Sequence, residues 1–281
     1  MRLDAHQHFW RYSTEKYPWI PEGSALAQEW LPADLAQLQI PLGFDGSIAV
    51  QAQQTVAETE WLLSLADQDA RIHGVVGWVD LQHDRVEDDI ARLSMHPRLV
   101  GVRHVVQDEP DDQFMLRPEF QRGIGRLQAF KLRYDILIYP RQLPAALQLV
   151  RNFPDQPFVL DHISKPFIRA GTLSPWREQI RELAQHPNVL CKVSGMVTEA
   201  DPNNWKQDDF VPFLDVVFEA FGTDRLMFGS DWPVCLLAGS YDRVVGLLED
   251  YVGTRNRLDS SEAAGLWGVN AARFYGVQTP R

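Results

Sequence analysis

Eight short apolar segments recur along this chain, and the spacing leaves room for a helix between successive segments. Strands are predicted at residues 3–8, 47–51, 73–79, 99–105, 134–139, 157–162, 188–194 and 225–231. Near-continuous apolar runs are typical of parallel strands that are buried on both faces. Amphipathic patterns predict helices at residues 58–68, 84–96, 119–130, 143–150, 174–183, 210–221, 241–252 and 261–275. The alternation predicts the α/β class and a single-domain (β/α)8 TIM barrel over residues 1–281. A doubly wound open sheet is the alternative, but no glycine-rich phosphate loop follows the first strand.

Composition excludes several classes of partner. The chain has 27 basic and 38 acidic residues, a formal net charge of −11, and 45% hydrophobic residues. An acidic protein without a basic patch is not expected to bind nucleic acid or an anionic membrane. Two distant cysteines and the lack of a signal peptide or long apolar run favour a cytoplasmic protein without disulfides. The composition is compatible with a monomer and with a homo-oligomer.

The first strand ends in two histidines that are one residue apart, His6 and His8. Because side chains alternate across a strand, both imidazoles are expected on the same face, where they can converge on one metal ion or one reacting group. An H-x-H sequence is common by chance, so its significance depends on the rest of the chain.

Polar residues also collect where the other predicted strands end, and in a barrel of this kind those ends carry the chemistry. The candidates at these ends are Arg103, His104, Tyr139, Arg141, His162, Lys165 and Asp231. Arg103 and His104 are adjacent, so their side chains point to opposite faces and only one is expected to enter the site fully. Asp231 can be a loop cap or a catalytic base, and His162 a core residue or a site residue. Lys192, within an apolar strand, is either a buried charge that needs an anion or a structural contact.

Residues 9–33 follow the histidines directly and fit neither a helical nor an alternating pattern. Long loops in compact domains are uncommon and often functional. We therefore expect this aromatic-rich loop to lie over the site, with Trp10 and Trp30 as candidate substrate contacts.

The chain resembles the amidohydrolase superfamily, through His6-x-His8, His162 and Asp231 on strands 1, 6 and 8. Four stretches resemble the lactonase branch that includes the sugar lactonases and 2-pyrone-4,6-dicarboxylate lactonase. They are Asp4-Ala5-His6-Gln7-His8-Phe9-Trp10, Gly101-Val102-Arg103-His104, Leu160-Asp161-His162-Ile163-Ser164-Lys165-Pro166 and Phe228-Gly229-Ser230-Asp231-Trp232-Pro233.

Strand 5 departs from the wider superfamily, because it ends on Tyr139 where a metal-ligating histidine is common. The bridging lysine of binuclear members is also missing from strand 4. The resemblance therefore implies at most one divalent ion, zinc or manganese, held by His6, His8 and Asp231. Metal-free hydrolysis is the equal alternative.

The resemblance implies that the chain hydrolyses a small-molecule lactone of a sugar acid, such as L-fuconolactone or L-rhamnonolactone. Asp231 would be the general base, the three histidines would polarise the carbonyl, and Arg103, His104, Tyr139 and Arg141 would hold the substrate. The rival hypotheses are a lactonase for a pyrone dicarboxylate, a metal-dependent decarboxylase of an aromatic acid, and a non-catalytic carbohydrate-binding barrel.

Overall fold

The computed structural model describes residues 1–277 and contains an eight-stranded parallel sheet whose strands pair in sequence order. The strands are β1 (Leu3–Gln7), β2 (Gly46–Val50), β3 (Ile72–Gly77), β4 (Leu99–His104), β5 (Arg133–Ile136), β6 (Phe158–Leu160), β7 (Val189–Val193) and β8 (Leu226–Phe228). Just beyond the end of β8, the Asp231 amide donates to the His6 carbonyl at 2.8 Å, and the His8 amide donates to the Trp232 carbonyl at 2.7 Å. These two bonds join the first strand to the last and close the (β/α)8 barrel.

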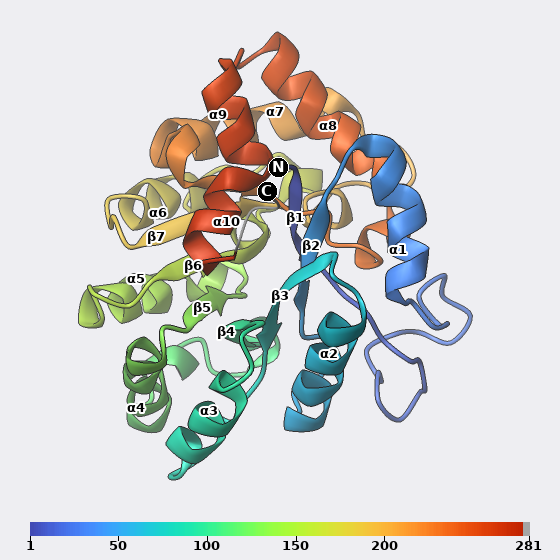
Figure 1. The fold of residues 1–281 in the computed structure, drawn as a ribbon. Coiled ribbons are helices and arrows are strands. Elements are labelled where there is room, and N and C mark those ends of the chain that lie inside the picture. The colour runs from blue at the N-terminus through green and yellow to red at the C-terminus, as the bar shows by residue number, and fades with distance from the viewer. Residues whose placement is uncertain (278–281) are drawn as a thin grey trace.

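Helices surround the strands (Figure 1). They are α1 (Pro32–Gln39), α2 (Val56–Gln68), α3 (Val86–Ser94), α4 (Pro118–Leu127), α5 (Leu143–Asn152), α6 (Trp176–Leu183), α7 (Gln207–Phe221), α8 (Tyr241–Thr254), α9 (Ser260–Ala264) and α10 (Asn270–Tyr275). Each of the helices α2 to α8 packs its buried apolar side chains against the outside of the barrel. Within residues 1–277, none of the helices is both long and apolar enough to cross a bilayer.

The helix α10 covers the end of the barrel at which the strands begin, beside the N-terminus (Figure 1). Its buried Ala271, Phe274 and Tyr275 pack against inward-facing apolar residues such as Leu3 and Val159. The bottom of the barrel is therefore filled with side chains, and the polar groups of the interior lie above this apolar layer.

Three local features differ from the sequence prediction. The helix α1 lies where no helix is predicted, because only Leu35 and Gln39 on it are buried and the apolar repeat is weak. The predicted helix 261–275 is interrupted between α9 and α10 by a π-helical turn, Gly265–Val269, in which the backbone of Gly268 is not helical. A Cβ on Gly268 would lie 2.8 Å from the backbone nitrogen of Leu3. The predicted helix at 84–96 is shorter than expected and spans Val86–Ser94.

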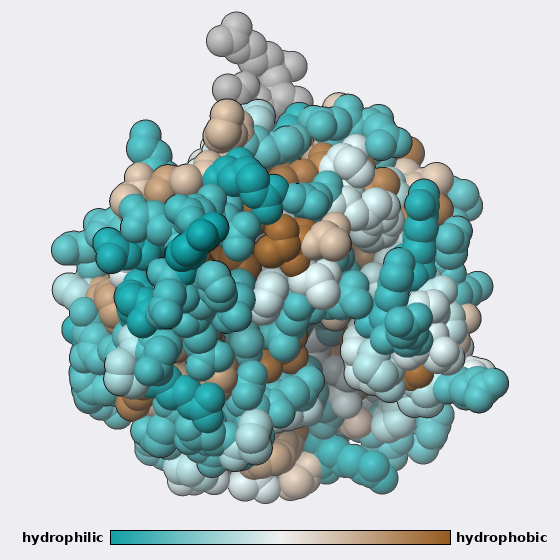
Figure 2. Space-filling model, turned by 90° about the horizontal axis from the view of Figure 1, so that it is seen from below, coloured by the Kyte–Doolittle hydropathy of each residue, from teal (hydrophilic) through white to brown (hydrophobic). Residues whose placement is uncertain are grey.

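Most of the surface is hydrophilic. Figure 2 shows one face, on which teal residues dominate and apolar residues form small separate areas. Among residues 1–277, the face in this view carries no extended apolar patch.

Candidate active site

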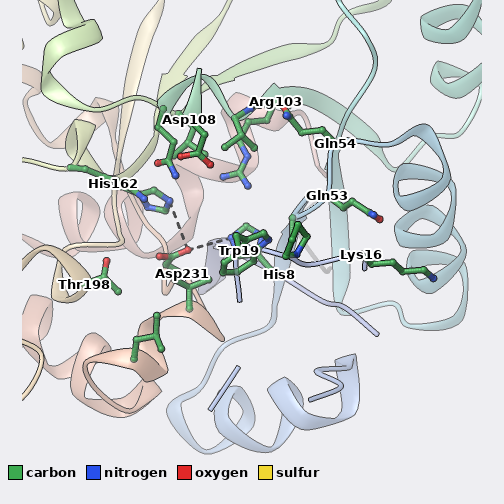
Figure 3. Close-up of a pocket in the computed structure, with 18 of the residues that line it drawn as sticks. His8, Lys16, Trp19, Gln53, Gln54, Arg103, Asp108, His162, Thr198 and Asp231 are labelled. Carbon is green, nitrogen blue, oxygen red and sulfur yellow. Dashed lines mark hydrogen bonds and ion pairs between the residues drawn. The ribbon is translucent and has the colours of Figure 1, made fainter. Parts of the chain in front are cut away.

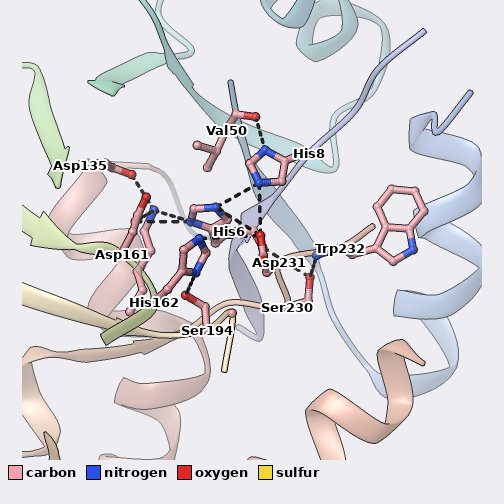
Figure 4. A network of polar contacts seen from close by, with 12 residues as sticks. His6, His8, Val50, Asp135, Asp161, His162, Ser194, Ser230, Asp231 and Trp232 are labelled. Atoms are coloured by element: carbon pink, nitrogen blue, oxygen red, sulfur yellow. Dashed lines mark hydrogen bonds and ion pairs between the residues drawn. The ribbon is translucent and has the colours of Figure 1, made fainter. Parts of the chain in front are cut away.

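Three histidines and one aspartate meet inside the barrel at the ends of β1, β6 and β8. Nε2 of His8 lies 3.3 Å from Oδ1 of Asp231, and Nε2 of His6 and of His162 each lie 3.8 Å from the same oxygen. All four side chains are buried. The cluster is the one that the sequence pattern indicates, and the strand ends bring it together (Figure 4).

Irregular backbone aims these side chains inward. The register of β1 against β2 shifts between Asp4 and Gln7, the stretch that contains His6. Asp231 has a φ of 56° and His162 a φ of 54°, in the left-handed region that residues other than glycine seldom adopt. Such conformations concentrate at functional sites, where the surrounding structure holds them in place.

The carboxylate of Asp4 holds the two strand ends together from below the site. It accepts hydrogen bonds from the amides of His6 at 3.1 Å and Ser230 at 2.9 Å, and from the Tyr241 hydroxyl at 3.2 Å. Burial raises the pKa of Asp4 to about 6, although these hydrogen bonds act to lower it. Asp4 therefore fixes the spacing between the residues that precede Asp231 and those that carry the histidines.

The imidazole rings are oriented by neighbours on their Nδ1 side. Nδ1 of His8 lies 2.8 Å from the Val50 carbonyl, so this nitrogen donates its proton to that carbonyl. Nδ1 of His162 lies 2.9 Å from the Ser194 hydroxyl. Both Nε2 atoms are thereby directed at Asp231.

A buried cation, Lys192 on β7, lies beneath His6. Its Nζ is 2.5 Å from Asp135, 3.0 Å from Asp161 and 3.2 Å from Nδ1 of His6. Asp135 also accepts from the Tyr275 hydroxyl of α10 at 2.8 Å. Of the two alternatives for Lys192, the structure contains the buried charge with anionic partners.

Arg103 on β4 lies against the same network. Its Nη1 is 3.0 Å from Asp161 and 3.2 Å from Nε2 of His6, and its Nη2 donates to the Gln51 carbonyl at 2.5 Å. Arg103 is only 4% exposed. A guanidinium held on three sides is a preorganised cation in a dry site.

The surroundings keep His6 and His162 neutral and Asp231 charged at neutral pH. Burial lowers the pKa of His6 and of His162 well below 6.5. Burial acts to raise the pKa of Asp231, but His162, His8 and Lys165 outweigh it and hold the pKa below its ordinary value. Asp231 is therefore an ionised carboxylate beside the neutral imidazoles of His6 and His162.

The donor set of His6, His8 and Asp231 fits a divalent ion. Nε2 of His6 and Nε2 of His8 are 3.2 Å apart, close to the about 3.4 Å that two zinc–ligand bonds span at a tetrahedral angle. These two nitrogens and Oδ1 of Asp231 converge in a buried site, an arrangement that a cation stabilises. His6, His8 and Asp231 can thus hold a metal ion.

A cavity of about 660 Å³ opens above the cluster (Figure 3). Its volume suits a small-molecule ligand. His8, His162, Asp231 and Arg103 form part of its wall. The residues that line the rest include Glu15, Lys16, Pro18, Trp19, Gln53, Gln54, Gln107, Asp108, Lys165, Thr198, Glu199 and Leu237.

Of the predicted substrate contacts, Arg103 and Lys165 line this cavity, whereas His104 does not. His104 points to the outside of β4, where its ring stacks on Phe114 with centroids 4.8 Å apart and its Nε2 lies 2.7 Å from Glu109. Side-chain alternation along β4 explains the difference between these neighbours.

Tyr139 and Arg141 also lie away from the cavity wall. The strand β5 ends at Ile136, so Tyr139 is in the following loop, where its ring lies 5.5 Å from Nζ of Lys165. Arg141 pairs with Asp112 at 2.7 Å. The predicted strand 134–139 is therefore too long, and the later residues are displaced outward.

The aromatic loop does lie over the site, but Trp19 is its aromatic contact with the cavity. Trp10 is fully buried, and Trp30 packs edge-on against Trp232 with centroids 5.2 Å apart. Trp19 is 44% exposed and faces the cavity (Figure 3). The structural role of Trp10 and Trp30 is to shape the loop that presents Trp19.

Sequence reasoning missed Asp161 and Asp135, the anions of the buried network. Asp161 directly precedes His162 at a strand end, which is a usable signal. Asp135 lies in an apolar strand four residues before its predicted polar end, and only the fold places it beside Lys192. The missed cavity residues Gln53, Gln54 and Asp108 lie on loops whose path the sequence does not predict.

Comparison with known proteins places this site in a family. The family model described as Amidohydrolase matches residues 3–277. An L-fucono-1,5-lactonase of Burkholderia multivorans is 44% identical over 294 aligned positions, covering 100% of this chain and 97% of that protein. One from Burkholderia ambifaria is 37% identical, covering 99% and 97%. A crystal structure of an amidohydrolase from Burkholderia multivorans with bound zinc has a TM-score of 0.95 at 43% identity, covering 99% and 100%. The barrel, the histidine–aspartate cluster and these matches agree, and the chain belongs to the amidohydrolase family.

Proposed function

We propose that this protein hydrolyses a sugar-acid lactone of the L-fucono-1,5-lactone type, with Asp231 as the general base. The observation that carries the proposal is the ionised Asp231 carboxylate in the wall of a small-molecule cavity, facing Nε2 of His8 and His162. The two L-fucono-1,5-lactonases aligned over nearly the whole chain support the same reaction.

The chemistry begins with a water molecule between Asp231 and the lactone carbonyl. Asp231 takes a proton from this water as the water oxygen bonds to the carbonyl carbon. The negative charge that develops on the carbonyl oxygen is stabilised by Arg103, whose guanidinium is fixed by Asp161 and the Gln51 carbonyl. His162, oriented by Ser194, contributes to the same stabilisation.

Collapse of the tetrahedral intermediate breaks the bond between the carbonyl carbon and the ring oxygen. The ring oxygen leaves as an alkoxide and takes the proton from Asp231, which returns to its ionised form. The products are a hydroxyl group and a carboxylic acid, which releases one proton to the solvent. A divalent ion held by His6, His8 and Asp231 would supply Lewis-acid polarisation of the carbonyl.

The charges at the cavity favour a neutral, hydroxyl-rich substrate. The wall has no excess of positive charge, because its basic residues Lys16, Arg103 and Lys165 are matched by the acidic residues Glu15, Asp108, Glu199 and Asp231. Carboxylates and amides accept and donate hydrogen bonds to hydroxyls, and the Trp19 face suits the apolar face of a sugar ring. A pyrone dicarboxylate needs additional free cations, and Arg141 is already paired with Asp112 outside the cavity.

The test is a pH-stat screen of sugar lactones, with and without a chelator, on the wild type and on Asp231→Asn. We expect acid release with L-fucono-1,5-lactone or a close stereoisomer, and a fall in turnover of about 10²–10⁴-fold in Asp231→Asn. Asp112→Asn, which changes a carboxylate outside the cavity, is the control and should retain turnover. Wild-type turnover by Asp231→Asn would refute the assignment of the base. Release of carbon dioxide from an aromatic acid would favour the decarboxylase, and lactone binding without acid release would favour the binding protein.

A further inference from the structure

The segment between β1 and α1 is built around a small apolar cluster of its own. Trp10, Tyr17, Ile20 and Leu26 are buried together, apart from the main barrel core. Backbone bonds of 3.0 Å in both directions between Trp10 and Trp30 bring the two ends of the segment together. The Trp10 indole also donates to the carbonyls of Leu26 and Gln28. Residues 9–31, here called the lid segment, therefore form a compact unit.

The lid segment supplies one wall of the cavity. Glu15, Lys16, Pro18 and Trp19 all line it. Tyr17, in the middle of this run, points the other way and is buried. The position of Tyr17 therefore sets the position of the residues that face the substrate.

The Tyr17 hydroxyl donates to Glu58 of α2 at 3.1 Å. The second carboxylate oxygen of Glu58 accepts from the amides of Ala52 at 2.9 Å and Gln53 at 2.6 Å. Ala52 and Gln53 lie in the loop between β2 and α2, which also lines the cavity. One buried carboxylate thus joins two walls of the cavity.

This carboxylate is held at an energetic cost. Glu58 is 4% exposed, and burial raises its pKa to about 7, against its hydrogen bonds and the positive charge of Arg103. Helix α2 needs no buried acid at this position for packing, since its core face is formed by Leu62, Leu63 and Ala66. A costly buried group with three hydrogen bonds to cavity-forming segments points to a positioning role.

We propose that Glu58 and Tyr17 are positioning residues that hold the lid segment against the β2–α2 loop and so set the affinity of the site for its lactone. The inference rests on the proposed function, because lactone is the ligand whose binding it concerns. Neither side chain lines the cavity or contacts Asp231. The strand ends that carry Asp231 and His8 are joined by their own backbone bonds. The Tyr17–Glu58 contact therefore acts on KM and leaves the chemical step in place.

The test is Tyr17→Phe, which removes one hydroxyl and keeps the ring in its cluster. Tyr12→Phe is the matched control, since Tyr12 is in the same lid segment and its buried hydroxyl has no hydrogen-bond partner among residues 1–277. A hydrogen bond to a charged acceptor corresponds to about one order of magnitude in an equilibrium constant. We expect Tyr17→Phe to raise KM about tenfold with kcat changed less than about twofold, and Tyr12→Phe to leave both unchanged.

A second measurement is hydrogen exchange of the lid segment in the free protein, with a melting temperature as the check on folding. Exchange in residues 9–31 should be faster in Tyr17→Phe than in the wild type and in Tyr12→Phe. Equal KM and equal exchange in the two variants would overturn the inference, as would a fall in kcat at constant KM. If the wild type opens no lactone, the proposed function fails, and the exchange measurement still decides whether Tyr17 and Glu58 hold the lid segment.

Discussion

Replacing Lys192 by methionine removes the cation from the buried network beneath His6. The methionine side chain is close to lysine in length and fills the same space, so packing changes little. Asp135 and Asp161 lose the Nζ that lies 2.5 Å and 3.0 Å from their oxygens. Both carboxylates are fully buried. Asp161 retains Arg103, and within residues 1–277 Asp135 retains only the Tyr275 hydroxyl.

Removing one partner of a buried ion pair costs about 3–5 kcal/mol, because the other charge stays buried without compensation. Unfolding entropy near the melting temperature is about 2.1 cal/mol/K per residue, or about 0.6 kcal/mol/K for the 281 residues of this chain. The melting temperature of Lys192→Met should therefore fall by about 5–8 °C. Burial already raises the pKa of Asp135 to about 6, so proton uptake relieves the missing charge at lower pH. The fall should be smaller at about pH 5 than at about pH 8.

Differential scanning calorimetry at the two pH values measures the effect. Lys16→Met changes an exposed lysine and should shift the melting temperature by less than about 1 °C. The double variant Asp135→Asn/Lys192→Met removes the anion together with the cation and should recover part of the loss. A fall of less than about 2 °C in Lys192→Met, or an equal fall at both pH values, would refute the view that Lys192 compensates buried carboxylates.

Two further predictions concern the neighbours Arg103 and His104 on β4 and the buried Glu58 on α2. Arg103→Gln should lower kcat/KM of the lactone reaction at least about 100-fold, because Arg103 lines the cavity. His104→Gln, on the outside of β4, should lower kcat/KM less than about threefold. Equal losses in the two variants would contradict the opposite orientation of the two side chains. Glu58 has a pKa of about 7 when folded against an ordinary 4.5, so the folded state binds more protons between these values and loses stability there as the pH rises. The stability of the wild type relative to Glu58→Gln, from urea unfolding, should therefore fall by about 1–3 kcal/mol between about pH 5 and pH 8, and a constant difference would contradict the buried carboxylate.

Local sequence patterns predicted the architecture well because strand and helix formation in this fold depends on nearby residues. The eight predicted strands all occur, and the fold is a (β/α)8 barrel. Errors lie at the ends of elements, as at β5, where the apolar run continues beyond Ile136 although strand pairing stops there. The missed helix α1 buries too little apolar surface to produce a clear repeat.

The sequence by itself determined which strand ends carry polar residues, and therefore that His6, His8, His162 and Asp231 meet. Parallel strands in a barrel all end at the same rim, so that inference needs only the order of the elements. Tertiary structure alone decided which side chains form the walls and supports of the site. The Lys192–Asp135 pair and the Tyr17–Glu58 contact join residues 57 and 41 positions apart. No periodic pattern links such distant positions, because their pairing depends on strand register and on the path of the lid segment.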